Sequence, residues 1–261
     1  MEKCAVFIDI DGTLLNTHHE ISKDTRITLR LLRENGHKLY ICSGRPLCDI
    51  DDYILELNFD GIVAAGGAYV ISKGIVYRNI QFNTKEVERV EEVLNEARAG
   101  ICYEMEDGVF ATALFKKILV DNIKVFSKSY VEKVQINDKK ILNTGKITFI
   151  CEKEQFDKIK EKLNKDYEVI KAPYMDHTNN YVFAEICLKG ITKEDGIKSL
   201  GLSEKIIAIG DSDNDIDMIK YADIGIAMGN ASAKCKEVAD IITSHVDEEG
   251  FFKAFKKIKM I

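Results

Sequence analysis

Short apolar runs alternate with amphipathic stretches along the first third of the chain. Each run is short for a helix and is followed closely by Asp, Ser or Gly, as expected of a strand buried on both faces. The runs occupy residues 4–10, 38–42 and 61–65. Between the first two, Ser22 offers an N-cap, and Ile27 and Leu31 recur at helical spacing. Strands that alternate with helices form a parallel, doubly wound sheet, so we expect an α/β fold.

Two further elements are expected before residue 80. Pro46 suits the first turn of a helix, which we place at roughly residues 46–57. Residues 68–77 contain two short strand-like runs around Lys73-Gly74. This pattern predicts a β-hairpin that turns at these two residues.

The last third of the chain repeats the alternation of strands and helices. Strands are predicted at residues 205–210, 223–228 and 240–243, and helices at residues 214–221 and 232–238, before a terminal helix. The two ends of the chain are therefore predicted to build one Rossmann-like core together.

The middle of the chain has a different order, in which a helix is followed by two strands. This order is predicted twice, first at residues 84–98, 101–105 and 109–113, and then at residues 154–163, 167–172 and 181–187, preceded by a strand at residues 146–151. Residues 116–143 give no clear pattern. We expect residues 1–81 and 187–261 to form the core, and residues 82–186 to form an inserted α+β domain, whose length of about 100 residues is typical of a domain.

Composition and charge narrow the class of protein. Hydrophobic residues make up 46% of the 261 residues and charged residues 31%, as in a globular protein with a sizeable core. A formal net charge of −6 without a basic stripe argues against a nucleic-acid partner. No apolar run approaches the roughly 18 residues that span a bilayer, and the N-terminus lacks the features of a signal peptide. Seven cysteines without a C-x-x-C pair predict reduced core thiols in a cytoplasmic protein.

Two acids lie at the carboxyl end of the first predicted strand, in residues 9–13 (DIDGT). Ligands of open parallel sheets bind at the carboxyl ends of the strands. Asp9 and Asp11 can divide the chemistry there, one as an ionised nucleophile and metal ligand, the other as an acid that protonates the leaving group. The alternative is a solvated turn, but so specific a string directly after a buried strand favours a functional site.

A second acidic cluster, residues 210–215 (GDSDND), follows another predicted strand. Acids at the start of a helix stabilise it, so helix capping is one interpretation. Carboxylates about 4 Å apart, however, repel each other by roughly 4 kcal/mol at an effective dielectric constant of 20, and a divalent cation cancels that cost. Oxygen ligands without nearby His or Cys favour Mg²⁺ over zinc.

Two weaker signals come from a serine and a lysine. Ser43 and Gly44 follow the second strand, where they can begin a turn or bind a phosphate oxygen at a helix start. Lys193 follows Thr192, a good N-cap, and lies in the first turn of a predicted helix. A lysine there is usually a surface residue, unless a phosphate among carboxylates needs a compensating cation.

These four motifs, in this order, resemble those of the haloacid dehalogenase (HAD) superfamily of phosphohydrolases. The resemblance covers the whole chain. Within the superfamily, the chain most resembles the Cof-type branch, in which a large α/β cap (type IIB) is inserted between the second and third motifs. The inserted domain predicted at residues 82–186 would then be a cap that selects the substrate.

The resemblance implies a role for each acid. Asp9 is then the nucleophile that forms an aspartyl-phosphate, and Asp11 protonates the leaving oxygen before it activates water. Mg²⁺ would be bound by Asp9, the backbone carbonyl of Asp11, and Asp211, with Asp215 as a support or an occasional ligand.

The resemblance also implies a phosphate site, formed by Ser43, Gly44, Lys193 and Asn214. The substrate would be a small phosphorylated metabolite, such as a sugar phosphate, and the protein a monomer or a weak homo-oligomer. Two positions depart from the Cof-type pattern, because Glu194 stands where Gly is usual after the lysine, and Gly66 where Asn is usual. These departures concern the range of substrates more than the activity.

Two other functions remain open at this point. A phosphomutase of the same superfamily uses the same aspartyl-phosphate but returns the phosphoryl group to a sugar. A receiver-like signalling module also pairs acids, a phosphorylated Asp and a Lys, although Asp11 and the large insert argue against it. In the most polar loop of the insert, His177 is a candidate substrate contact, with a solvated loop residue as the alternative.

Overall fold

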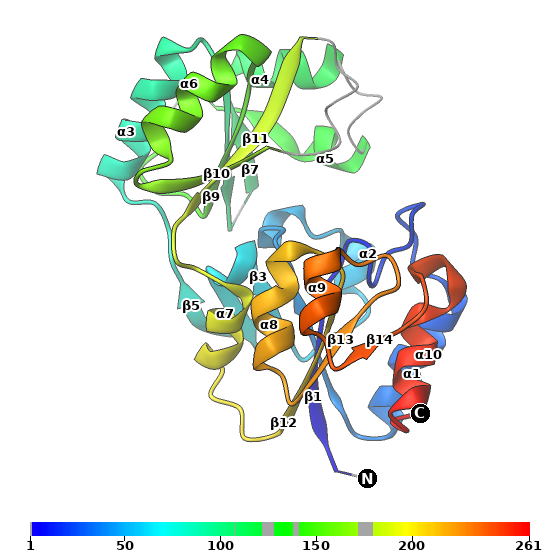
Figure 1. Ribbon diagram of the computed structural model, residues 1–261. Helices are drawn as coiled ribbons and strands as arrows, with labels where there is room; N and C mark the ends of the chain where they lie inside the picture. Colours follow the sequence, from blue (N-terminus) through cyan, green and yellow to red (C-terminus); the bar gives the residue numbers. More distant parts are fainter. Residues whose placement is uncertain (1, 107, 122–127, 138–140, 172–179) are drawn as a thin grey trace. The chain divides into compact units, whose positions relative to one another are not determined.

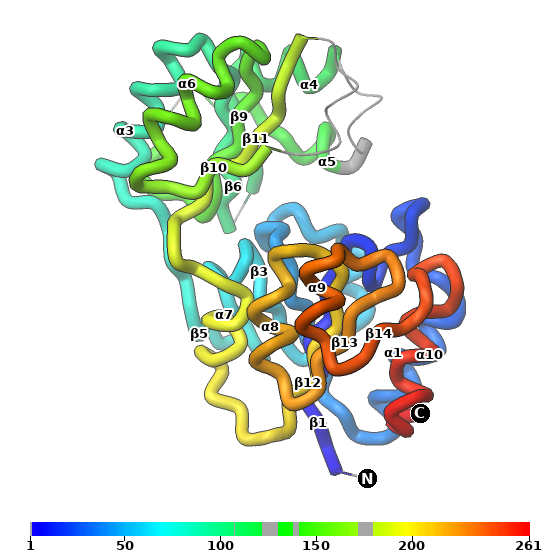
Figure 2. The backbone as a smooth tube through the Cα atoms, in the orientation of Figure 1, coloured from blue at the N-terminus to red at the C-terminus, as the bar shows by residue number. Residues whose placement is uncertain are grey.

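The computed structural model describes residues 2–106, 108–121, 128–137, 141–171 and 180–261 (Figures 1 and 2). The chain forms two compact units, which are described separately. Unit 1 comprises Met1–Arg45, Leu55–Asn79 and Ile191–Ile261, and unit 2 comprises Pro46–Ile54 and Ile80–Gly190. Within the described ranges, no helix has both the length and the apolar character needed to cross a membrane.

Unit 1 is built on a sheet of eight strands. In spatial order they are β14 (Ile241–Ile242), β13 (Ile224–Ala227), β12 (Lys205–Gly210), β1 (Cys4–Ile8), β2 (Lys38–Cys42), β3 (Gly61–Ala64), β4 (Tyr69–Ser72) and β5 (Ile75–Asn79). Pairing is parallel from β14 to β3 and antiparallel for β4 and β5. The predicted α/β fold with a Rossmann-like, doubly wound sheet is confirmed.

Helices cover both faces of this sheet (Figure 1). On one face lie α7 (Lys193–Ser199), α8 (Ile216–Tyr221) and α9 (Ala233–Val238), which share an apolar core with alternate β1 residues such as Phe7. α1 (Lys23–Glu34) packs against β2 and against α10 (Gly250–Lys257). The alternation of buried side chains along β1 thus supplies a core to each layer of helices.

The register of the central strands determines where the polar residues emerge. Ile8 of β1 is paired with Ile209 of β12 and with Ile41 of β2. Parallel strands in register end at the same edge of a sheet. Three residues of the predicted motifs follow within two positions of this level: Asp9, Ser43 and Asp211.

The helix predicted at roughly residues 46–57 is wrong as one element. The segment forms a short 3₁₀ turn over Leu47–Asp49 and then α2 (Asp52–Leu55), with Ile50 extended between them at ψ 125°. The physical reason is local, because three aspartates lie within four positions here, and Asp favours caps and turns over helix interiors. Pro46–Ile54 also belongs to unit 2, whereas the sequence pattern predicted it to be part of the core.

The predicted hairpin at residues 68–77 is confirmed as β4 and β5. Lys73 and Gly74 both have positive φ, at 51° and 76°, as a tight two-residue turn requires.

The turn after β3, over Ala65–Gly67, is in backbone contact with α7. Gly67 has a φ of 103°, and a Cβ there would overlap the carbonyl of Thr192. On the helix side, a Cβ on Gly196 would lie 2.9 Å from the Cα of Gly67. Two glycines therefore allow the start of α7, which carries Lys193, to lie directly against the end of β3.

We expect Gly67→Ala to lower the free energy of unfolding by about 2 kcal/mol or more, because the new Cβ adds a backbone clash to the strain of a positive φ. Gly66→Ala is the matched control. Gly66 has a φ of 63° in the same turn, but nothing lies within 4 Å of the position that a Cβ would take there, so only the strain is added. Urea unfolding of both variants measures the difference, and equal losses would contradict the close contact.

Unit 2 is a second, six-stranded sheet with its own cores. In spatial order its strands are β10 (Tyr167–Lys171), β11 (Tyr181–Leu188), β9 (Lys146–Glu152), β6 (Gly100–Met105), β7 (Gly108–Ala111) and β8 (Val134–Ile136). Besides most of α2, its described α-helices are α3 (Thr84–Glu96), α4 (Ala113–Asp121), α5 (Lys128–Lys133) and α6 (Lys153–Leu163). The order helix–strand–strand is confirmed for α3-β6-β7 and for α6-β10-β11. α5, β8 and most of α4 lie in the stretch that gave no pattern, while Ala113, the first residue of α4, ends the strand predicted at residues 109–113.

Candidate active site

Three carboxylates gather in unit 1 at the edge of the sheet where β1 and β12 end. They belong to Asp9, Asp211 and Asp215, and one oxygen of each lies within 4.8 Å of the others. Asp9 is 5% exposed and Asp215 is fully buried. Over the described ranges, no other group of three acidic, His or Cys side chains comes close enough to share a metal ion.

Lys193 places its ammonium group between two of these acids. Its Nζ donates to Oδ1 of Asp9 at 2.7 Å and to Oδ1 of Asp215 at 2.5 Å. The side chain is 1% exposed and starts from the first turn of α7, whose N-cap is Thr192. Burial lowers the pKa of Lys193, but the two carboxylates raise it by more, so the lysine remains charged. The alternative of a surface lysine is therefore wrong.

The acids themselves are held in a medium that disfavours their charge. Burial is the main cause of a pKa of Asp9 well above its usual value, with Asp215 adding to the rise and Lys193 opposing it. Burial and Asp215 likewise raise the pKa of Asp211 to about 7. A divalent cation among these groups would reverse both shifts, because an adjacent positive charge favours ionised carboxylates.

Asp211 has the arrangement expected of a metal ligand. Its Oδ2 accepts a hydrogen bond from Nδ2 of Asn230 at 3.1 Å, whereas its buried Oδ1 has no partner in the described part of the chain. Buried polar atoms are nearly always paired, so an unpaired carboxylate oxygen beside two other acids fits a bound cation. Carboxylate oxygens are the ligands that Mg²⁺ prefers. The residues present therefore fit a magnesium ion.

Asp215 has less freedom to bind an ion. Its Oδ2 accepts hydrogen bonds from the backbone N–H groups of Asp211 and Ser212 at 3.0 and 2.9 Å, while its Oδ1 is bonded to Lys193. A Cβ on Gly210 would lie only 2.5 Å from the carboxyl carbon of Asp215. These contacts indicate that Asp215 organises the loop that carries Asp211.

Asp11 lies outside the carboxylate cluster. Its side chain is 50% exposed, and its two oxygens accept hydrogen bonds from Nε and Nη2 of Arg45 at 2.8 and 2.6 Å. Such a bidentate pair fixes the orientation of a carboxylate. The predicted contact between the backbone carbonyl of Asp11 and a metal stays a prediction.

The four predicted phosphate-binding residues come from three separate segments. Ser43 is 1% exposed, and its Oγ accepts a hydrogen bond from the backbone N–H of Arg45 at 3.1 Å. Gly44 lies close to Asn214, since a Cβ on Gly44 would be 3.3 Å from Nδ2 of Asn214. The structure thus brings the second and fourth motifs together, while Lys193 reaches Asp9. Their binding of phosphate stays a prediction.

Comparison with known sequences settles the family. The sequence profile of haloacid dehalogenase-like hydrolases matches residues 6–255. The chain belongs to this family. The predicted membership of the HAD superfamily and the predicted enzyme class, a phosphoric monoester hydrolase, are confirmed.

Relatives of this HAD-family chain match it from end to end. It is 28% identical to the 5-amino-6-(5-phospho-D-ribitylamino)uracil phosphatase YcsE of Bacillus subtilis, over 96% of this chain and 94% of the relative. It is 25% identical to the phosphoglycolate phosphatase of Methanothermobacter thermautotrophicus, over 97% of each. The structure of an HAD phosphatase from Bacteroides thetaiotaomicron is 26% identical, with a TM-score of 0.77 over 100% of this chain and 96% of that one.

Sequence reasoning gave no role to two residues of this HAD-family site, although one of them, Arg45, ends the second motif. Arg45 pairs with Asp11 and directly follows Ser43-Gly44. Its position next to a predicted phosphate site could have indicated a role in the site. Asn230, which contacts Asp211, lies in the loop after β13, the parallel strand next to β12. The sequence could have indicated Asn230 only as a polar residue that follows the end of another predicted strand.

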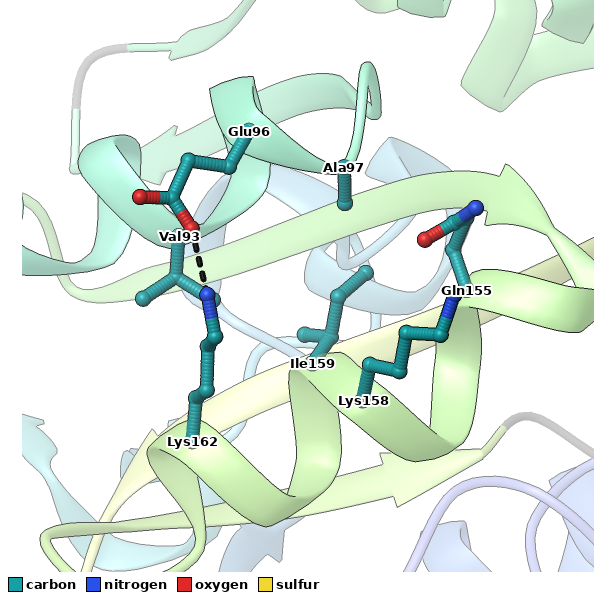
Figure 3. A pocket seen from close by; sticks show the side chains of 7 residues that line it. All are labelled: Val93, Glu96, Ala97, Gln155, Lys158, Ile159 and Lys162. Carbon is teal, nitrogen blue, oxygen red and sulfur yellow. Dashed lines mark hydrogen bonds and ion pairs between the residues drawn. The ribbon is translucent and has the colours of Figure 1, made fainter.

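Other candidates do not enlarge the site. His177 lies outside the described residues. A pocket in unit 2 opens between α3 and α6, where Lys162 pairs with Glu96 (Figure 3). None of the predicted site residues lines this pocket, so it offers no support for their chemistry.

We expect Lys193→Met to lower the free energy of unfolding by about 3–5 kcal/mol at pH 8, because two buried carboxylates lose their counter-ion. The loss should be smaller at pH 5. Asp9, whose pKa is already raised, takes up a proton as the pH falls and then needs no counter-ion. Urea unfolding of the wild type and the variant at both pH values, without divalent metal, measures the loss in the free energy of unfolding.

Lys198→Met is the matched control on the same helix. Lys198 is 50% exposed and pairs with Glu194, so its loss should change stability little at either pH. If Lys193→Met destabilised the protein equally at pH 5 and pH 8, the electrostatic explanation would be wrong.

Proposed function

We propose that this HAD-family protein is a Mg²⁺-dependent phosphatase that hydrolyses a small phosphomonoester through an aspartyl-phosphate on Asp9. One observation carries the proposal: the buried ion pairs of Asp9 and Asp215 with Lys193 lie beside the unpaired Oδ1 of Asp211. A buried carboxylate, a buried ammonium group and an unpaired carboxylate oxygen thus lie at one edge of the sheet, which supports roles as nucleophile, cation and metal ligand.

The positive charges of this arrangement would screen the repulsion between the attacking carboxylate and the phosphate. A carboxylate that attacks a phosphate dianion approaches a group of like charge, so cations must screen the two from each other. Lys193 supplies one positive charge at Oδ1 of Asp9, which leaves the second oxygen of this carboxylate for the attack. Asp9, Asp211 and the carbonyl of Asp11 would hold Mg²⁺, with Asp215 in support, and the ion would supply the remaining positive charge.

The reaction follows in two displacements. An oxygen of Asp9 attacks phosphorus, the bond to the leaving oxygen breaks, and Asp11 gives that oxygen a proton. Water then attacks phosphorus of the aspartyl-phosphate, the ionised Asp11 takes a proton from it, and the bond to Asp9 breaks. Inorganic phosphate leaves, and both aspartates return to their starting states.

Asp11 begins this cycle bound to Arg45. Since both of its oxygens accept hydrogen bonds from the guanidinium group, Asp11 must release Arg45 and take up a proton from solvent before it can protonate a leaving group; the protonated acid is then the state to which each turnover returns it. We infer that the arriving phosphate competes for the same guanidinium, because Arg binds carboxylates and phosphates with similar geometry. Ser43, Gly44, Lys193 and Asn214 would hold the phosphate oxygens.

The substrate is proposed only as a class, a sugar phosphate or a similar metabolite in the cytoplasm, and unit 2 is proposed to act as the cap. The two phosphatase relatives quoted above have different substrates, one a ribitylamino-uracil phosphate and the other phosphoglycolate. A screen with aryl, sugar, nucleotide and vitamin phosphates therefore comes first. Release of free phosphate distinguishes a phosphatase from a phosphomutase, and turnover distinguishes both from a receiver-like module.

We expect Asp9→Asn to abolish phosphate release in the presence of Mg²⁺, with a loss on the order of 10⁴-fold, because an amide cannot form the aspartyl-phosphate. A chelator should remove the activity of the wild type, and added Mg²⁺ should restore it. A colorimetric phosphate assay measures both effects. Phosphate release that persists in a folded Asp9→Asn variant would contradict the mechanism.

We expect Asp11→Asn to affect substrates according to their leaving groups. The kcat/KM for an alkyl phosphate should fall by about 10²- to 10⁴-fold, since its leaving oxygen needs a proton. The kcat/KM for p-nitrophenyl phosphate should fall much less, because that leaving group departs as an anion. Equal losses for both substrates would show that Asp11 does not act as the acid.

A further inference from the structure

Asn230 lies in a loop that none of the four motifs includes. The loop follows β13 and is bonded to the end of β12 at two points. The backbone N–H of Met228 donates to the carbonyl of Gly210 at 3.0 Å, and that of Ser232 donates to the carbonyl of Asp211 at 2.8 Å. The starting point of the Asn230 side chain is therefore set by the same strand that carries Asp211.

The side-chain amide of Asn230 makes three hydrogen bonds. Its Nδ2 donates to the carbonyl of Gly12 at 2.8 Å and to Oδ2 of Asp211 at 3.1 Å, and its Oδ1 accepts from the backbone N–H of Val246 at 3.0 Å. Both amide hydrogens are used. Rotating the amide by 180° would set Oδ1 against two acceptors, so the network permits only one orientation.

These bonds join the two halves of the carboxylate cluster. Gly12 belongs to the turn after β1, and a Cβ on Gly12 would overlap Oδ2 of Asp211. The turn and the carboxylate are thus in direct contact, and Asn230 bonds to both. With Oδ2 held by the amide, Oδ1 of Asp211 is the oxygen left without a partner among the described residues.

We propose that Asn230 is a positioning residue for Mg²⁺, which holds Oδ2 of Asp211 so that Oδ1 faces the ion, and which holds the turn at Gly12 at a fixed distance from Asp211. The inference rests on the magnesium site of the proposed function. Residues that hydrogen-bond to a metal ligand fix its orientation, and their loss typically weakens metal binding by about 10- to 100-fold.

The test is the affinity of the full chain for Mg²⁺ alone, measured by isothermal titration calorimetry without substrate. Asn230→Ala should raise the dissociation constant by about 10- to 100-fold. The matched control is Asn35→Ala in the same unit, because Nδ2 of Asn35 also donates to a backbone carbonyl, that of Met260 at 2.7 Å. The control should lose stability but keep the wild-type affinity for Mg²⁺ within about twofold.

Activity gives a second signature. In Asn230→Ala, the Mg²⁺ concentration for half-maximal phosphate release should rise, while kcat at saturating Mg²⁺ stays within about threefold of the wild type. A purely structural role would lower the melting temperature and leave the Mg²⁺ dependence unchanged. A folded Asn230→Ala protein with wild-type Mg²⁺ affinity overturns the inference.

Val246→Pro decides the question if Asn230→Ala does not fold. Val246 opens a 3₁₀ turn after an extended His245 with ψ 151°, a place where proline fits, and proline removes the N–H that holds Oδ1 of Asn230. The dissociation constant for Mg²⁺ should rise by about threefold to tenfold, as expected for one lost hydrogen bond. Unchanged affinity overturns the inference. A wild type that binds no Mg²⁺ overturns the proposed metal site itself.

Discussion

The ion pairs that Lys193 makes with Asp9 and Asp215 are the interaction on which the arrangement of unit 1 depends. Three carboxylates converge at one edge of the sheet, two of them buried, and like charges at such distances repel strongly in a medium of low dielectric constant. One buried ammonium group compensates part of that charge. The remaining excess of negative charge makes the site receptive to a divalent cation.

Close backbone packing makes this compensation possible. Lys193 starts from the first turn of α7, and α7 can approach β3 only because Gly67 and Gly196 carry no Cβ. Gly12 plays the same part for Asp211, because a Cβ there would overlap Oδ2 of Asp211. The charges and the glycines therefore depend on each other, since a shift of about an ångström would separate the ammonium group from its acids.

Features that depend on local pattern were predictable from the sequence. The strand that delivers Asp9 and the strand that delivers Asp211 were found because each is a short apolar run followed by acids. The burial of Lys193 was not predictable, since the local sequence around a lysine in a first helical turn is the same whether its side chain faces solvent or an acid. The helix at residues 46–57 was wrong because it was placed on the fit of Pro46 to a first helical turn, while the preference of the three following aspartates for turns was given no weight. Asn230 was missed because it bonds to Gly12, which lies 218 positions away.

The turn after β1 places two carboxylates from neighbouring positions in very different surroundings. Asp9 has almost no contact with solvent, while the Asp11 side chain is 50% exposed and reaches a guanidinium group. A single tight turn thus separates Asp9, the proposed nucleophile, which is buried, from Asp11, the proposed proton carrier, which is half exposed. In the proposed mechanism, substitutions around Asp11 and Arg45 would therefore alter proton transfer to the leaving group without changing the surroundings of Asp9.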